Sequence, residues 1–265
     1  MDFRTKVDIR KDAAGICHEH SITLLGSCFS DNIGQKLVDA GFSACVNPLG
    51  TLYNPASIHD AICQSALPEE KRNGEFFSWL HSKAHGLIPE GENVLIITFG
   101  TAWIYRLKDS GMIVANCRKQ PDRLFTRERL TVEDIVRMYS EPLFTERLSH
   151  DGKPTRILLT VSPIRHRKDG FHENQVSKST LILAVEELCR LYPETYTYFP
   201  AYEIMMDELR DYRFYADDML HPSQKAVDYI WERFQDIFFS DTTKLRVMEE
   251  EKETRRKNHI PLNRE

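Results

Sequence analysis

The sequence predicts an α/β protein: a three-layer α/β/α sandwich around a mostly parallel central sheet. Two segments of the 265 residues, 93–99 and 156–161, are continuous apolar runs, which are typical of strands buried on both faces of a parallel sheet. Such strands alternate along the chain with segments of helical periodicity, and a helical crossover is what a parallel connection requires. Polar motifs follow several of these strands, where parallel sheets collect their binding residues.

The first third of the chain contains two strands and two helices by these criteria. In order, we expect a strand at 21–25, a helix at about 31–41, a strand at 44–46, a turn-rich loop at 47–55 and a helix at 58–66 capped by Ser57. Residues 67–92 are polar and contain three glycines, so we interpret them as an excursion from the sheet whose aromatic residues pack locally.

The rest of the chain continues the alternation. We expect a strand at 93–99, a hairpin of strands 104–107 and 112–115, a helix at 125–139 capped by Thr131, a strand at 156–161, a helix at 174–191, a strand at 195–199, a short helix at 203–209 and an amphipathic helix after Ser223. Residues 1–245 are therefore predicted to form a single domain. Residues 246–265 are a charged tail without an apolar period, which indicates a solvated helical extension or disorder.

The composition is that of an ordinary globular protein. The hydrophobic fraction is 41% and the formal net charge is −5, so we expect no nucleic-acid partner.

The six cysteines lack any Cys-x-x-Cys pair, which favours free thiols, and neither a metal site nor a cofactor is expected. No segment resembles a signal peptide or is long enough to span a bilayer, so we expect a cytoplasmic protein with no membrane partner. The sequence does not give the oligomeric state.

The stretch Gly26-Ser27-Cys28 follows the first expected strand and precedes its helix. Ser27 therefore lies near a helix N-terminus, where unpaired backbone N–H groups and the helix dipole favour an anionic oxygen. A serine at this position can cap the helix, or it can attack a carbonyl whose oxyanion the nearby N–H groups stabilise. Cys28 is a poorer candidate, because adjacent residues in a turn point apart.

A second motif, Asp218-Met219-Leu220-His221, lies just before the last amphipathic helix. A carboxylate three residues before a histidine, held in a turn, can orient the imidazole and stabilise its cationic form, and the histidine can then take a proton from a serine elsewhere. Asp217 stands beside Asp218, but the spacing selects Asp218 as the orienting carboxylate.

Five motif blocks occur in an order that resembles the GSCFA domain family, an SGNH-like (GDSL-type) hydrolase group. They lie at 26–30, 47–55, 98–103, 161–166 and 198–203. The first block has Ser30 where the family name has alanine. The resemblance covers roughly residues 20–240 and implies a flavodoxin-like fold and a catalytic triad of Ser27, His221 and Asp218.

The resemblance also implies an oxyanion hole. Its donors would be the N–H of Ser27, the N–H of Gly50 and a residue of the third block, where Thr101 stands in place of the expected asparagine. Threonine is a shorter donor, so an amide from Asn47 or Asn54 is the alternative.

The candidate substrate-binding residues include Asn47 and Asn54 of the second block, and two further groups. Trp103 ends the third block, and Arg165 and His166 end the strand at 156–161 on the expected side of the sheet. Arg165 and His166 can contact an acidic or hydroxyl-rich substrate, or can pair with carboxylates such as Glu203 or Asp207.

The function that these residues favour is a serine esterase. The resemblance implies that its substrates are small O-acyl esters, such as acetyl esters of carbohydrates, with a small molecule or carbohydrate ester as the partner. Two alternatives remain open. One is a non-catalytic carbohydrate- or ligand-binding protein on the same fold, which the missing asparagine supports. The other is an O-acyltransferase that uses the same triad with a sugar hydroxyl in place of water.

Overall fold

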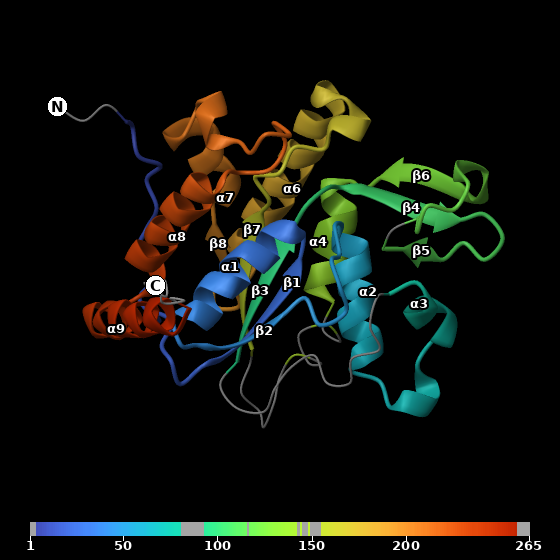
Figure 1. The fold of residues 1–265 in the computed structure, drawn as a ribbon. Helices are drawn as coiled ribbons and strands as arrows, with labels where there is room; N and C mark the ends of the chain where they lie inside the picture. The colour runs from blue at the N-terminus through green and yellow to red at the C-terminus, as the bar shows by residue number, and fades with distance from the viewer. Residues whose placement is uncertain are drawn as a thin grey trace, which may run out of the picture.

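The central sheet contains five strands, all of them parallel (Figure 1). The computed structural model describes residues 4–80, 93–115, 117–141, 144, 148 and 155–258. The strands are β1 (Ser21–Gly26), β2 (Ser43–Val46), β3 (Asn93–Phe99), β7 (Arg156–Val161) and β8 (Tyr196–Phe199), in the order β2-β1-β3-β7-β8. This order reverses between β1 and β3, which places a ligand-binding crevice at the carboxyl ends of those two strands.

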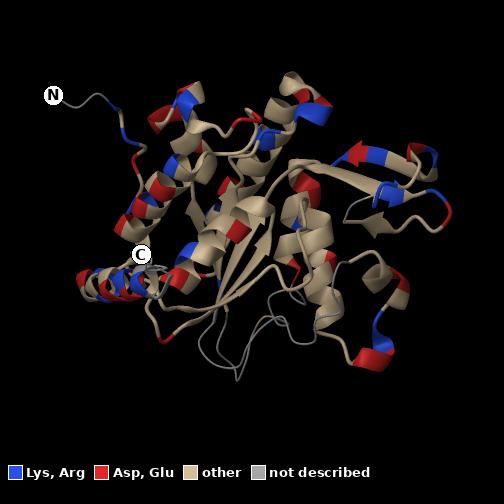
Figure 2. Ribbon diagram, in the orientation of Figure 1, with Lys and Arg blue, Asp and Glu red and all other residues tan. Residues whose placement is uncertain are grey.

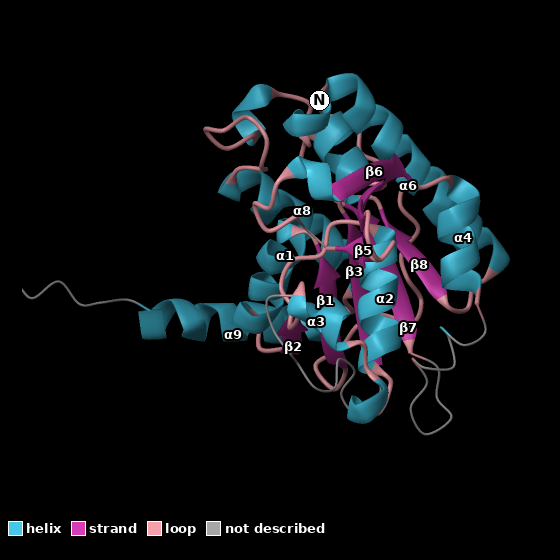
Figure 3. Cartoon of the chain, turned by 90° about the vertical axis from the view of Figure 1, so that its right-hand side faces the viewer, coloured by secondary structure: helices cyan, strands magenta, loops and turns pink. Residues whose placement is uncertain are grey.

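Helices cover both faces of the sheet, which confirms the predicted three-layer sandwich (Figure 3). One layer contains α1 (Cys28–Asp39), α8 (Gln224–Phe238) and α9 (Asp241–Asn258), and the other contains α2 (Pro55–Ser65), α4 (Val132–Ser140) and α6 (Phe171–Leu191). Alternate strand residues belong to two separate cores: Leu24 and Ile96 to the first, Leu25 and Ile97 to the second. Burial on both faces explains the continuous apolar runs in the sequence.

A second, antiparallel sheet projects beside the main one (Figure 1). It consists of β4 (Trp103–Leu107), β5 (Ile113–Val114) and β6 (Phe125–Arg129), in the order β5-β4-β6. The hairpin is confirmed, but the prediction of one helix over 125–139 was wrong. Residues 125–129 pair with β4, and only Phe125 of this strand is buried. Pairing with β4 therefore decides its conformation, and the helix begins after the capping box of Thr131 and Asp134.

Other helix boundaries differ from the prediction by a few residues. The α2 helix starts at Pro55 because Asn54, and not Ser57, is its N-cap: Asn54 Oδ1 accepts the Ser57 N–H at 2.8 Å. The short elements are α3 (Gly74–Ser78), α7 (Ala201–Glu203), a π-helical turn at Ile204–Glu208, and 3₁₀ turns at Glu69–Lys71, Asp122–Leu124, Arg167–Asp169 and Tyr212–Phe214.

The excursion predicted at 67–92 is described only as far as residue 80. In that part, Phe76 and Phe77 of α3 are buried in the core under α2 and α4, which agrees with local packing of its aromatic residues. Residues 81–92, and whatever role they have at the site, lie outside the described residues.

The charged residues lie mainly on the outer helices and on the small sheet (Figure 2). The α9 helix carries both signs of charge and runs through residue 245, where we placed the domain boundary, and its Val247 is buried against the core. Residues 259–265 lie outside the described part. Among the helices that the structure describes, none is long and apolar enough to cross a membrane.

Gly26 ends β1 at the point where the strand order reverses. Its φ is +146°, and a Cβ at this position would lie 2.3 Å from Thr98 O of β3. Only glycine avoids this clash, so the packing of β1 on β3 at the crevice depends on the missing side chain.

We expect Gly26→Ala to lower the free energy of unfolding by about 2 kcal/mol or more, because backbone strain and overlap with β3 occur together. Gly74→Ala is the matched control: a Cβ at Gly74 meets nothing within 4 Å, so stability should change by less than about 1 kcal/mol. Urea denaturation measures both. Equal effects of the two substitutions would contradict the assignment.

Candidate active site

Ser27 lies buried at the carboxyl end of β1 and is the N-cap of α1. Its Oγ accepts the Phe29 N–H at 3.3 Å, and its own N–H donates to Thr98 O at 3.3 Å. No described residue accepts a hydrogen bond from the Ser27 hydroxyl. The serine thus has the capping role and also remains placed for attack at the positive end of the helix dipole.

Asp218 and His221 are paired in the turn before α8, as their spacing predicted. Asp218 Oδ2 lies 2.5 Å from His221 Nδ1, while Asp218 Oδ1 accepts the N–H groups of Leu220 and His221 at 2.8 and 2.9 Å. These hydrogen bonds, from the backbone of His221 first and from its ring next, lower the pKa of Asp218 to about 2. The carboxylate is therefore ionised at neutral pH and fixes the orientation of the ring.

His166 lies close to Ser27. A Cβ built on Gly100 would lie 3.4 Å from Ser27 Cβ and 3.5 Å from His166 Nε2, so both side chains flank this glycine. Burial first, and then the positive charge of Lys178 and the proximity of His221, lower the pKa of His166 to about 4. The imidazole is thus neutral at pH 7, and its buried Nε2 has no hydrogen-bond partner among the described residues.

Within the described part of the chain, no hydrogen bond joins Ser27 to His221. His166 flanks Gly100 together with Ser27, and the Arg165 N–H donates to Leu220 O in the turn that holds His221, so the serine and both histidines lie at the same edge of the sheet. His221 is about half exposed, whereas Ser27 is buried. Catalytic hydrogen bonds are often long without substrate and tighten when it binds.

The donors predicted for the oxyanion hole are engaged in internal hydrogen bonds. The Gly50 N–H donates to Asn47 O at 2.8 Å, and the Thr101 N–H donates to Tyr53 O at 2.9 Å. The Thr101 hydroxyl lies 3.1 Å from Ser177 Oγ and accepts the Trp103 N–H at 3.2 Å. The Ser27 N–H is bonded to Thr98 O. The backbone N–H groups of all three predicted residues are therefore engaged in this conformation.

The two asparagines have different roles. Asn47 is a brace: its Oδ1 accepts the Gly26 N–H at 2.9 Å and its Nδ2 donates to Asp31 Oδ1 at 2.7 Å. Asn54 uses its Oδ1 to cap α2, and no described residue accepts a hydrogen bond from its Nδ2. Asn54 also lines the cavity beside the crevice, so its amide is the uncommitted donor of the two.

One cavity of about 230 Å³ brings together four of the predicted residues: Asn54, Thr101, Trp103 and His166. Arg127 of β6 covers Trp103, with its guanidinium 4.0 Å from the ring centroid. Arg165 turns the other way and lines a different cavity, and it pairs with neither Glu203 nor Asp207, the suggested carboxylates. Glu203 instead accepts the Tyr198 hydroxyl.

Lys178 of α6 is a functional candidate that the sequence analysis did not identify. It is buried, and its Nζ donates to Gly100 O and to Ser162 O, each at 2.6 Å. It thereby links the loops that follow β3 and β7, directly behind His166. Its spacing from the buried Leu181 and Val185 places it on the apolar face of the helix, a signal that the sequence does contain.

Burial lowers the pKa of Lys178 to about 7, although its two carbonyl acceptors favour the charged form. In the unfolded chain a lysine keeps its proton up to about pH 10.4, so above about pH 7 the unfolded state binds more protons than the folded state. We therefore expect the wild type to gain stability relative to Lys178→Met as the pH rises from about 7 to 9. Urea denaturation across this range measures the difference, and a difference independent of pH would contradict it.

Among the described residues, no group of three or more His, Cys, Asp or Glu side chains is arranged to hold a metal ion. The titratable side chains gathered here are the paired Asp218 and His221, the neutral His166 and the buried Lys178.

Two solved structures show weak overall similarity. One is a protein from Streptococcus pneumonia whose name refers to platelet activating factor, with 13% identity, coverage of 82% of this chain and 84% of that chain, and a TM-score of 0.44. The other is a carbohydrate esterase family 3 protein from Talaromyces cellulolyticus, with 11% identity, coverage of 81% and 94%, and a TM-score of 0.39.

A comparison with curated proteins finds no match. The GSCFA family model matches residues 21–92 and 80–234, which together include every motif block and both halves of the site described above. The chain belongs to the GSCFA family.

Proposed function

We propose that this protein is a serine esterase of the SGNH type, which hydrolyses small O-acyl esters such as acetyl esters, including those of carbohydrates, through Ser27, His221 and Asp218. The observation that carries the proposal is the 2.5 Å contact between an ionised Asp218 and the His221 ring, at the same sheet edge as a serine on a helix N-terminus. This combination supplies a nucleophile, a base and a group that orients the base.

The reaction has two steps. His221 Nε2 takes the hydroxyl proton as Ser27 Oγ attacks the ester carbonyl, and the imidazolium then gives that proton to the leaving alcohol as the C–O bond breaks. Water, deprotonated by His221, attacks the acyl-serine, and the imidazolium returns that proton to Ser27 Oγ as the bond between Oγ and the acyl carbon breaks and the acid is released. Asp218 stays ionised throughout and holds Nδ1–H, so that Nε2 is the free base. Ser27 Oγ must leave its contact with the Phe29 N–H to react.

Stabilisation of the oxyanion is assigned to Asn54 Nδ2 and to the N-terminal ends of α1 and α2. Asn54 has an amide that no described residue occupies, and it faces the cavity beside the crevice. The positive ends of the two helix dipoles add to it. Ser27, Gly50 and Thr101 contribute only if substrate binding breaks their internal hydrogen bonds.

The second candidate is a non-catalytic binding protein on the same fold. The engaged donors of Gly50 and Thr101 and the capping role of Ser27 favour it. An O-acyltransferase would follow the steps above with a sugar hydroxyl in place of water, and addition of an acceptor sugar during turnover separates it from the esterase.

We expect Ser27→Ala to reduce hydrolysis of an aryl acetate by about a thousandfold or more, because the nucleophile is lost. The matched control is Cys28→Ala, which removes the neighbouring thiol and should change the rate by less than about threefold. Steady-state kinetics on both purified variants, with circular dichroism to check folding, give the answer. If Ser27→Ala keeps its activity and Cys28→Ala loses it, the nucleophile is the cysteine.

Asp218→Asn should lower kcat by about a hundredfold to ten-thousandfold, since the amide still accepts the backbone N–H groups but no longer stabilises the imidazolium. Asp217→Asn, at the adjacent exposed carboxylate, should have little effect. Because the pKa of Asp218 is about 2, its protonation should produce no loss of activity above about pH 3 in the wild type. Similar losses in both variants would exclude the assigned role of Asp218.

A further inference from the structure

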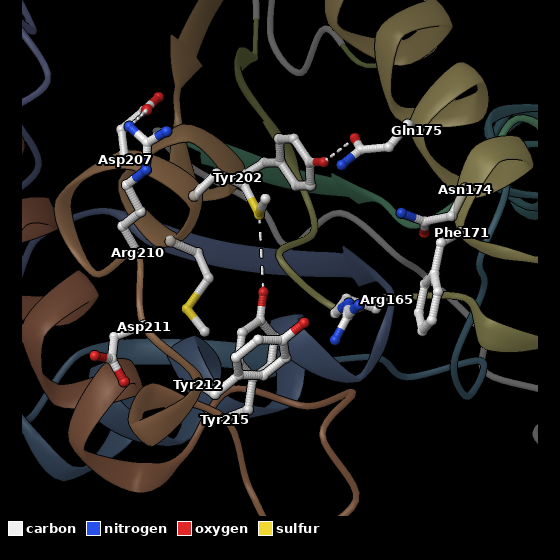
Figure 4. Close-up of a pocket in the computed structure, with 12 residues that line it drawn as sticks. Arg165, Phe171, Asn174, Gln175, Tyr202, Asp207, Arg210, Asp211, Tyr212 and Tyr215 are labelled. Carbon is white, nitrogen blue, oxygen red and sulfur yellow. Dashed lines mark hydrogen bonds and ion pairs between the residues drawn. The ribbon is translucent and has the colours of Figure 1, made fainter.

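A second cavity, of about 370 Å³, is lined by Arg165 (Figure 4), whereas the next residue, His166, lines the cavity that contains Asn54. Its walls come from the start of α6, from the helical turns at 201–208 and from the 3₁₀ turn at Tyr212–Phe214. It is an open cavity with polar and apolar walls, as small-molecule sites usually are.

Arg165 carries the one charge in this cavity that no oppositely charged described residue balances. Figure 4 shows its guanidinium between Phe171 and the rings of Tyr212 and Tyr215, at 4.2, 5.8 and 5.3 Å from the ring centroids. No described carboxylate forms an ion pair with it. The cavity therefore presents a cation held by aromatic rings and ready for an anionic partner.

The two carboxylates of the cavity are already paired. Asp207 lies 3.8 Å from Arg210, and Asp211 lies 2.8 Å from Arg213, which lowers the pKa of Asp211 to about 2. Each carboxylate thus has an arginine beside it, and Arg165 is the charged group of the cavity that no described residue of opposite charge pairs.

The cavity is connected directly to the candidate active site. The Arg165 N–H donates to Leu220 O at 3.1 Å, and its guanidinium donates to Met219 O at 3.0 Å. Both carbonyls belong to the turn that holds Asp218 and His221. A ligand on Arg165 would thus contact a residue that braces the turn of Asp218 and His221.

The rings around Arg165 are exposed although they are large. Phe171 is 50% and Tyr212 is 65% exposed, so beyond their contacts with Arg165 both rings offer apolar surface to a ligand. The cavity is also lined by hydrogen-bonding side chains: the Tyr202 hydroxyl donates to Gln175 Oε1, and both residues line it. Flat apolar faces beside hydrogen-bonding groups fit a sugar ring.

We propose that this cavity binds an acidic sugar, with the carboxylate on Arg165 and the ring against Phe171 and Tyr212. None of Ser27, Asp218 and His221 lines this cavity, so the assignment does not depend on the proposed esterase function. A carboxylate fits better than a phosphate dianion, because a single positive charge without a described ion-pair partner faces it and the side chains of Asp207 and Asp211 lie in the same cavity.

The test compares the binding of D-glucuronate, D-glucose and inorganic phosphate by calorimetry, in low salt, with the full chain. The wild type should bind glucuronate at least about tenfold more tightly than glucose or phosphate. Arg165→Met should lose this preference. Arg210→Gln is the matched control: it removes an arginine of the same cavity whose charge Asp207 shares, and it should change the affinity by less than about twofold.

The Arg165 guanidinium also donates to Met219 O, so Arg165→Met removes both the positive charge and a contact with the turn. Arg165→Lys keeps the positive charge, and so separates the effect of the charge from the effect of that contact. Partial recovery of glucuronate binding in this variant supports a direct contact. Equal binding of glucose and glucuronate by the wild type, tighter binding of phosphate, or unchanged binding by Arg165→Met would overturn the proposal.

Measuring glucuronate binding and esterase activity on the same wild-type protein separates this inference from the proposed function. Arg165-dependent binding of glucuronate together with no esterase activity in the wild type would leave the acidic-sugar site standing and remove the esterase. Esterase activity without such binding would do the reverse.

Discussion

The close approach of Gly26 to Thr98 is the constraint on which the rest of the site depends. With no side chain at Gly26, β1 and β3 come together at the point where the strand order reverses. The backbone of Gly26 also holds the following loop, since its N–H donates to Asn47 Oδ1 and its carbonyl accepts the Leu52 N–H. One residue thus fixes the start of α1, the end of β3 and the loop that leads to Asn54.

The other half of the site is held by buried polar groups. Lys178 joins the carbonyl groups of Gly100 and Ser162, and the Arg165 loop bonds the turn that contains His221. The Lys178 hydrogen bonds lie in the low-dielectric interior, where they are strong and costly to break, so they hold the loops that follow β3 and β7 in one arrangement. The arrangement leaves the Asp218–His221 pair at the surface, where a substrate can reach it.

Much of this was predictable because it depends on local pattern. The buried strands follow from unbroken apolar runs, and the contact of Asp218 with His221 follows from their spacing within a turn. The strand at Phe125–Arg129 was not predictable in this way, because its conformation depends on pairing with β4. Which donors are already engaged, as at Gly50 and Thr101, depends on contacts between distant segments, which residue identity does not reveal. The role of Ser27 in catalysis stays a prediction.

The most direct test of the central claim, that Ser27 is a nucleophile activated by His221, is labelling with a fluorophosphonate probe followed by mass spectrometry of the modified peptide. Such probes react with serines that a neighbouring base activates. The account predicts an adduct on Ser27 in the wild type and none in His221→Ala. No adduct on Ser27, or an equal adduct in both proteins, would contradict it and would leave Ser27 as the cap of α1.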